Sequence, residues 1–269
     1  MTGTVSTLSI ICMAISGIIS FAIPVVLFIY FRKKKKADVL PFFAGCAVML
    51  LFALILESSV HRLVFASPAG EKILNTTWLY ALYGGLMAGL FEETGRFCAF
   101  KTVLKKYREN DANALMYGAG HGGFEAAALL GLASINNIAY SVLINTGGID
   151  TVLSAVPAEL KPQLETAVQT LTSASSPQFL LGGAERIFAV TLQIALSVLV
   201  WFAAKDPGKR YLYPLAIFIH FAVDALMVVI SSAGVPMLGV ECFVGACAAA
   251  AAFIAKKVWV LNHRAEMQE

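Results

Sequence analysis

Histidines and carboxylates recur at helical spacing inside apolar sequence. Three short stretches carry them: FEETGRF at 91–97, GHGGFEA at 120–126 and HFAVD at 220–224. His121 precedes Glu125 by four residues, and His220 precedes Asp224 by the same number. Residues four apart lie on one face of a helix, so each imidazole would stand beside a carboxylate. Such pairs can hold a metal ion or transfer a proton to and from water.

The first stretch adds two glutamates and an arginine. Arg96 follows Glu93 by three residues and Glu92 by four, which places the three side chains at neighbouring positions of one helix. Arg96 can neutralise one glutamate, which lowers the cost of burying that carboxylate. The other glutamate is then left to face the histidines, and the spacing does not decide which glutamate this is.

Composition indicates that this chemistry would take place within a membrane. The chain has 269 residues, of which 58% are hydrophobic and 14% charged, and its mean hydropathy is +0.76. Soluble domains carry about 25% charged residues, and a soluble protein this apolar would expose more apolar surface than water tolerates. The net charge of +3 is too small to indicate a nucleic-acid partner. We expect one all-α integral membrane domain over residues 1–269, with membrane lipid as a partner.

Apolar runs predict a polytopic bundle of about seven transmembrane helices. They lie at 7–31, 38–66, 77–104, 112–145, 179–203, 211–231 and 235–255. Basic clusters follow the first, third, fifth and seventh runs, which by the positive-inside rule places the N-terminus outside and the C-terminus in the cytoplasm. The segment 146–178 then forms an extracytoplasmic loop, within which residues 153–171 can form an amphipathic helix.

The three motifs fall at a similar depth in the membrane. Counted along each helix from the nearest polar or basic residue on the cytoplasmic side, Glu93, His121 and His220 lie roughly 15 to 18 Å deep. Each ionisable residue at such depth costs ~2.5–3.5 kcal/mol on insertion scales and is usually functional. Gln193 lies at the same depth, where it can line the site or hydrogen-bond a neighbouring helix. Small residues that would let these helices approach closely are Gly85, Gly89, Gly118 and Gly122.

Other polar residues near the predicted spans are expected to be structural. Glu57, His61 and Arg62 fall at the outer edge of the second run, where water is near and long side chains can reach it. Glu185 and Arg186 are adjacent near the outer end of the fifth run, and we expect them to pair with another span or with the outer loop.

Two kinds of water activation fit these residue types. In a metal-assisted site, His121 and His220 would bind Zn²⁺ or another divalent metal, with Glu125 or Asp224 as a third ligand. A glutamate of the first stretch would then act as general base. In a metal-free site, a glutamate and a histidine would activate water directly, while the other histidine and Asp224 bind the oxyanion. HExxH is absent from the sequence, which excludes the common zincin arrangement but leaves both alternatives open.

In this order, EETGR, GHGGFEA and HFAVD resemble the motifs of the YhfC family of intramembrane proteases. That family is similar to the CAAX-protease and bacteriocin-processing group and to the PrsW proteases. The resemblance covers residues 80–260 and implies an endopeptidase of the bacterial plasma membrane that hydrolyses peptide bonds of a membrane or membrane-adjacent substrate. The expected site comprises four catalytic residues, Glu92, Glu93, His121 and His220, and four supporting residues, Arg96, Glu125, Gln193 and Asp224.

The resemblance leaves several points open. The EExxR spacing differs by one residue from the EExxxR of the CAAX group, so the resemblance does not assign the base to Glu92 or to Glu93. Gln193 stands where the family pattern has a histidine, which argues against a metal ligand there. Two other functions are compatible with the sequence: a non-catalytic membrane scaffold or immunity protein, and a proton-coupled transporter. The lack of an inverted repeat argues against the transporter.

Overall fold

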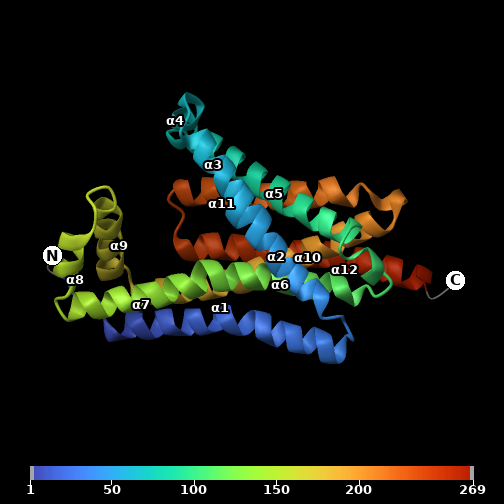
Figure 1. Ribbon diagram of the computed structural model, residues 1–269, viewed down its shortest axis with the longest axis horizontal. Helices are drawn as coiled ribbons and strands as arrows, with labels where there is room; N and C mark the ends of the chain where they lie inside the picture. The colour runs from blue at the N-terminus through green and yellow to red at the C-terminus, as the bar shows by residue number, and fades with distance from the viewer. Residues whose placement is uncertain (1–2, 267–269) are drawn as a thin grey trace. The chain divides into compact units, whose positions relative to one another are not determined.

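The protein is helical throughout the part that the computed structural model describes, residues 3–266 (Figure 1). No strand occurs in that part, which confirms the predicted all-α class. The chain divides into two compact units, unit 1 with residues 3–22 and 126–186 and unit 2 with residues 23–125 and 187–266. The expected single membrane domain stays a prediction, and each unit is described by itself.

Unit 1 contains the helices of the expected outer loop. Its elements are the first part of α1 (Thr7–Lys34), the π-helical η3 (Ala127–Gly131), α7 (Leu132–Asn145), α8 (Ile149–Ala155), α9 (Lys161–Ser173) and the start of α10 (Ser176–Lys205). Ile144 of α7, Leu153 of α8 and Val168 of α9 are buried in one apolar cluster. The loop 146–178 is therefore largely helical, and α9 confirms much of the helix predicted within 153–171.

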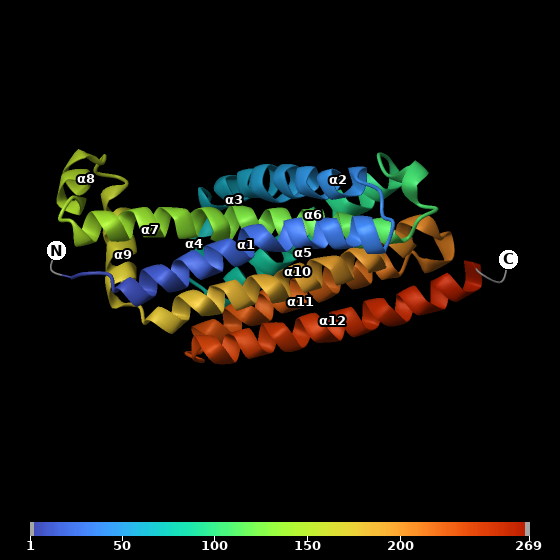
Figure 2. The ribbon, with the colours of Figure 1, turned by 90° about the horizontal axis from the view of Figure 1, so that it is seen from below.

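Unit 2 contains most of the remaining helices. With the rest of α1 and α10, its elements are α2 (Leu40–Val48), η1 (Met49–Glu57), α3 (Ser58–Phe65), α4 (Pro68–Leu74), α5 (Thr77–Lys101), η2 (Lys105–Tyr107), α6 (Ala112–Ala126), η4 (Pro207–Lys209), α11 (Leu212–Ser232) and α12 (Met237–Glu266). The π-helical η1 joins α2 to α3 in one continuous helix, while η2 and η4 are short 3₁₀ turns. Figure 2 shows α10, α11 and α12 lying side by side.

Six helices within the described residues are long and apolar enough to cross a membrane. They are Thr7–Lys34, Leu40–Phe65, Ala112–Asn145, Ser176–Lys205, Pro207–Ser232 and Met237–Asn262. The remaining expected run, 77–104, forms α5, which the charged residues of FEETGRF make less apolar. Large apolar side chains such as Ile18 and Phe218 are more than half exposed and would contact lipid. The protein is a multi-pass membrane protein, and its orientation stays a prediction.

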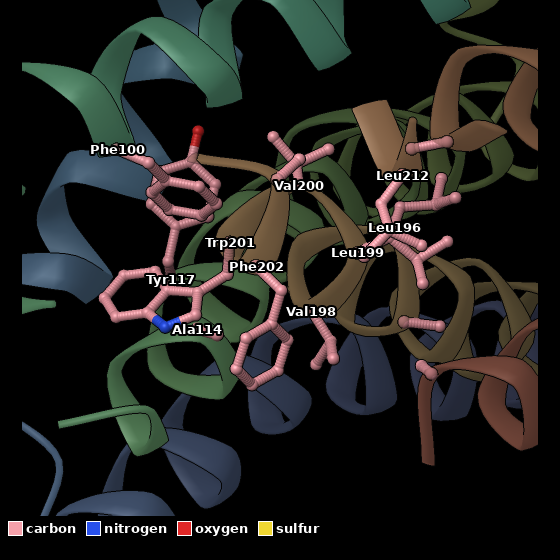
Figure 3. Close-up of a cluster of buried hydrophobic side chains, with 14 of the residues drawn as sticks. Phe100, Ala114, Tyr117, Leu196, Val198, Leu199, Val200, Trp201, Phe202 and Leu212 are labelled. Atoms are coloured by element: carbon pink, nitrogen blue, oxygen red, sulfur yellow. The ribbon is translucent and has the colours of Figure 1, made fainter. Parts of the chain in front are cut away.

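The apolar core of unit 2 forms around the C-terminal half of α10 (Figure 3). Leu196, Leu199, Val200, Trp201 and Phe202 are each at most 1% exposed. Phe100 of α5 meets Tyr117 of α6 edge to face at a centroid distance of 4.6 Å, and it meets Trp201 in the same way at 5.0 Å. These three buried rings, the aromatic plug, fix α5, α6 and α10 relative to one another.

Close approach of helices in unit 2 depends on glycine. A Cβ at Gly89 of α5 would lie 2.8 Å from the carbonyl oxygen of Ile217 in α11, which is too short for any side chain. A Cβ at Gly122 of α6 would lie equally close, 2.8 Å, to the Cβ of Gln193 in α10. The predicted small-residue contacts are thus confirmed for both helix pairs, and they bring the polar side chains of four helices within reach of one another.

Candidate functional site

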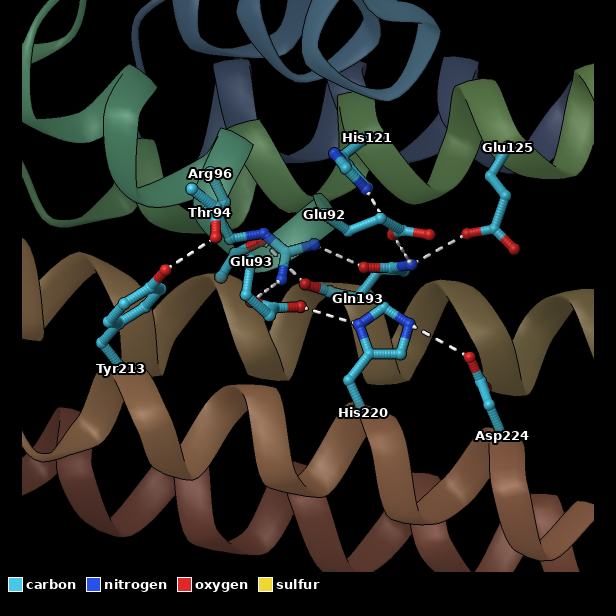
Figure 4. Close-up of polar contacts among 11 residues, drawn as sticks. Glu92, Glu93, Thr94, Arg96, His121, Glu125, Gln193, Tyr213, His220 and Asp224 are labelled. Atoms are coloured by element: carbon cyan, nitrogen blue, oxygen red, sulfur yellow. Dashed lines mark hydrogen bonds and ion pairs between the residues drawn. The ribbon is translucent and has the colours of Figure 1, made fainter. Parts of the chain in front are cut away.

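Eight polar residues from four helices meet inside unit 2 (Figure 4). We call them the polar cluster: Glu92, Glu93 and Arg96 of α5, His121 and Glu125 of α6, Gln193 of α10, and His220 and Asp224 of α11. All eight residues expected from the sequence are therefore brought together. Their contacts form two chains of hydrogen bonds and ion pairs that both begin at Arg96.

The first chain runs from α5 to α11. Nη1 of Arg96 donates to Oε2 of Glu93, and Oε1 of Glu93 lies 2.9 Å from Nδ1 of His220. On the other side of the imidazole, Nε2 lies 3.6 Å from Oδ2 of Asp224, beyond hydrogen-bond distance. Arg96 and Glu93 are completely buried, whereas the Asp224 side chain is 32% exposed. Arg96 thus pairs with Glu93, because each buried charge needs a partner of opposite sign.

The second chain runs through α10 to α6. Nη2 of Arg96 donates to Oε1 of Gln193, whose Nε2 lies 2.8 Å from Oε2 of Glu92 and 2.9 Å from Oε2 of Glu125. Nε2 of His121 also lies 2.8 Å from Oε2 of Glu92. An ionised carboxylate only accepts hydrogen bonds, so Nε2 of His121 carries the hydrogen. Gln193 therefore lines the site and also joins three helices.

The two oxygens of Glu92 differ in their contacts. Both His121 and Gln193 bind Oε2, and within the described residues Oε1 makes no such contact. Glu92 is 6% exposed, so that the carboxylate is buried but not completely enclosed. One oxygen is thereby held in place, and the other is left to bind a small molecule such as water.

The polar cluster is closed at one end and more open at the other. Tyr117 stacks on His121 at a centroid distance of 5.9 Å, and the aromatic plug to which it belongs lies on the side of the predicted cytoplasmic basic residues. Trp201 is eight residues, or about 12 Å, beyond Gln193 along α10. Glu125 and Asp224 lie at the opposite end and are half-buried. The end with these two acids is therefore the less buried end of the cluster.

The donor atoms decide whether the cluster can hold a divalent metal. Zn²⁺ takes three or four ligands, with nitrogen and oxygen donors at about 2.0–2.2 Å. Among residues 3–262, no three His, Cys, Asp or Glu side chains lie close enough to share an ion. Nε2 of His121 and Nδ1 of His220 instead bind two different glutamates. This arrangement does not fit a bound metal, and ligation by His121, His220 and Glu125 stays a prediction.

Glu57 joins the neighbourhood of the cluster, although the sequence placed it at the water-exposed edge of a span. It is only 7% exposed and lies close enough to Glu92, His220 and Asp224 to interact with them electrostatically. Oε1 of Glu57 lies 3.2 Å from Nε2 of His61. Glu57 is the last residue of the π-helical η1, a type of segment that is frequent at functional sites. The sequence signal that could have indicated a role for Glu57 is its spacing of four residues from His61, the same spacing as in the two His–acid pairs of the cluster.

Glu185 and Arg186 belong to unit 1 and are not members of the polar cluster. They form an ion pair with each other, in which Nε of Arg186 lies 2.6 Å from Oε2 of Glu185. The expected pairing with another span or with the outer loop is therefore replaced, for Glu185, by a contact with its own neighbour. Glu185 is half-buried and serves below as a reference for substitutions in the cluster.

Comparison with known proteins places this arrangement in context. Residues 19–244 match the family model described as "YhfC intramembrane metalloprotease", and the matched range includes the whole polar cluster. A Bacillus subtilis (strain 168) protein described as "Uncharacterized membrane protein YhfC" is 36% identical over 226 residues, which are 83% of this chain and 86% of that protein. No solved structure matches the chain.

Proposed function

The chain belongs to the YhfC intramembrane metalloprotease family, and on that premise we propose that it is an intramembrane endopeptidase. Its reaction would be hydrolysis of a peptide bond in a membrane or membrane-adjacent protein. The observation that carries the proposal is the buried carboxylate of Glu92, with Oε2 held by His121 and Gln193 and Oε1 left for water. A fixed carboxylate that can accept a proton from water is what general-base hydrolysis requires.

Glu92 takes the role of general base in this proposal. Oε1 accepts a proton from water while the water oxygen attacks the carbonyl carbon of the peptide bond. The same proton then passes from Glu92 to the leaving nitrogen as the carbon–nitrogen bond breaks. His121 and Gln193 act as positioning residues, because they fix the orientation of the carboxylate through Oε2.

His220 takes the role of oxyanion donor. Nδ1 is bound by Glu93, and Nε2 has no partner within hydrogen-bond distance among the described residues. In its protonated form, Nε2 donates to the carbonyl oxygen as that oxygen becomes negative. Asp224, 3.6 Å away, favours the positive charge on the imidazole. Arg96 supports both halves of the site through its contacts with Glu93 and Gln193.

The family description names a metal, but the steps proposed here use none. Each histidine binds a glutamate through one ring nitrogen only, so the other two nitrogens, Nδ1 of His121 and Nε2 of His220, would have to reach a common point before they could share an ion. Among the described residues no three possible ligand side chains share such a point, so a metal-bound form would differ from this arrangement. The difference is open to a direct test with chelators, described in the Discussion.

The proposal is tested by comparing membrane protein fragments from cells that produce the wild type or Glu92→Gln. New N-termini within or next to transmembrane segments are identified by mass spectrometry, and purified protein in proteoliposomes then receives synthetic peptides that span these sites. We expect cleavage to fall by about 10²–10⁴-fold in Glu92→Gln, the range for loss of a general base.

The matched control is Glu185→Gln, the same substitution at a half-buried glutamate outside the polar cluster. It should cleave the peptides at the wild-type rate. Identical fragment sets from wild-type and Glu92→Gln cells would overturn the proposal, as would equal cleavage of the peptides by both proteins.

A further inference from the structure

An apolar groove lies in unit 2 on the surface formed by α6, α10, α12 and the end of α1. Its volume is about 330 Å³. Leu115 of α6 and Ile194 of α10 line it, and both also pack against the buried cluster that contains Phe31 and Met116. This side of the groove is therefore a fixed part of the fold. The groove is lined by none of the residues of the polar cluster.

Small side chains on two helices leave this space open. Its lining includes Ala195 of α10 and Ala252 and Ala255 of α12, whose one-carbon side chains take up little of the space. Trp259 also lines the groove and packs edge to face against Phe202 at a centroid distance of 6.2 Å. Tryptophan is typical of the interface between lipid tails and water, so we expect the part of the groove at Trp259 to lie near the membrane surface.

The charged residues that line the groove are all positive. Lys35, just after α1, and Lys256 of α12 are exposed and line it, and no described Asp or Glu does so. Lys257, the next residue, instead lies over the ring of Phe253, with Nζ 4.5 Å from the centroid. The groove thus combines an apolar channel with two lysines, which suits an apolar chain that ends in a negatively charged group.

We propose that this groove binds one anionic phospholipid. An acyl chain lies along Leu115, Ile194 and Ala255, and the phosphate lies between the ammonium groups of Lys35 and Lys256. A transmembrane helix of another protein fits less well, because its apolar face offers no negative charge to Lys35 and Lys256. The lipid would tie α1 to α12, two helices far apart in the sequence.

The lipid class is tested by native mass spectrometry of the full-length protein purified in detergent. The protein is titrated with phosphatidylglycerol or with phosphatidylcholine of the same acyl chains. We expect tighter binding of phosphatidylglycerol, weakened roughly fivefold by Lys35→Gln and by Lys256→Gln, the effect of one basic residue near an anionic surface. Lys257→Gln is the matched control and should bind like the wild type.

Two further measurements distinguish the contribution of the lipid headgroup to binding from that of the acyl chain. Ala252→Phe fills the groove and should weaken the binding of both lipids, while millimolar inorganic phosphate should not displace bound phosphatidylglycerol. Thermal unfolding of each variant shows whether it is folded, and the lysine variants remain decisive if Ala252→Phe is not. Equal binding of the two lipids by the wild type would overturn the proposal. The proposal would also be overturned if Lys257→Gln weakened phosphatidylglycerol binding as much as Lys35→Gln or Lys256→Gln does. Displacement of bound phosphatidylglycerol by inorganic phosphate or by a single-span peptide would overturn it as well. The outcome is independent of any peptidase activity.

Discussion

Replacing Glu93 by glutamine should destabilise the fold much more than replacing Glu92 by glutamine. Glu93 and Arg96 are completely buried and paired, so that Glu93→Gln leaves the guanidinium without its counter-charge. Removing one partner of a buried ion pair costs about 3–5 kcal/mol. Glu92 instead accepts from His121 and Gln193, and a glutamine there keeps one oxygen as acceptor. The loss for Glu92→Gln is then about 1 kcal/mol, because both hydrogen bonds can remain but are no longer strengthened by a charged acceptor.

Thermal unfolding in detergent, followed by the circular dichroism of the helices, measures this difference. In a chain of this size each kcal/mol corresponds to about 2–4 °C in Tm. We expect a fall in Tm of roughly 6–20 °C for Glu93→Gln and of roughly 2–4 °C for Glu92→Gln. The double variant Glu93→Gln/Arg96→Gln, which removes both charges, should recover most of the loss.

Two results would refute this reasoning. One is a Tm of Glu93→Gln within about 2 °C of the wild type, which is less than 1 kcal/mol. The other is a double variant no more stable than Glu93→Gln, since that would show that Arg96 does not depend on Glu93 for its counter-charge. Either result would also remove the reason for assigning the base to Glu92 and the ion pair to Glu93.

Three further predictions follow from the same contacts. Excess 1,10-phenanthroline should leave peptide cleavage unchanged, because no three possible ligand side chains among the described residues meet around one point; a loss that Zn²⁺ restores would contradict this. Glu57→Gln should lower kcat for peptide cleavage and change the pH dependence of kcat, because Glu57 interacts electrostatically with Glu92, while its Tm stays that of the wild type. An unchanged pH dependence would place Glu57 outside the site. Gly89→Ala should lower the free energy of unfolding by roughly 1–3 kcal/mol through overpacking, seen as a lower Tm, whereas Gly84→Ala, with open space around its Cβ, should not; equal effects would refute the close contact of α5 with α11.

Much of the fold followed from hydropathy, because a helix that faces lipid must be apolar along its length. Thr7–Lys34 and Met237–Asn262 are clear examples. The polar cluster was also predictable, since spacings of three and four residues fix which side chains share a helix face. The sequence could not assign the partner of Arg96, because both glutamates are within reach along α5. The position of Nδ1 of His220 beside Glu93 is a tertiary contact.

Glu57 and the lysine-lined groove show what the sequence could not provide. Distance from the end of a helix predicted a water-exposed Glu57, but packing against other helices buries it. The groove depends on alanines of α10 and α12 that meet only in the folded protein. In both cases the outcome depends on which residues lie across a helix interface. The spacing of residues along a single helix does not give this information.

The aromatic plug has a consequence for turnover in the proposed peptidase. Phe100, Tyr117 and Trp201 fill the interior at one end of the polar cluster, so water, substrate and both fragments would have to use the less buried end at Glu125 and Asp224. A fragment that is slow to leave would then block the next substrate, and exit rather than bond cleavage would limit the rate. In the orientation predicted from the basic clusters, soluble peptides in the cytoplasm would be poor substrates, because the rings would separate them from Glu92.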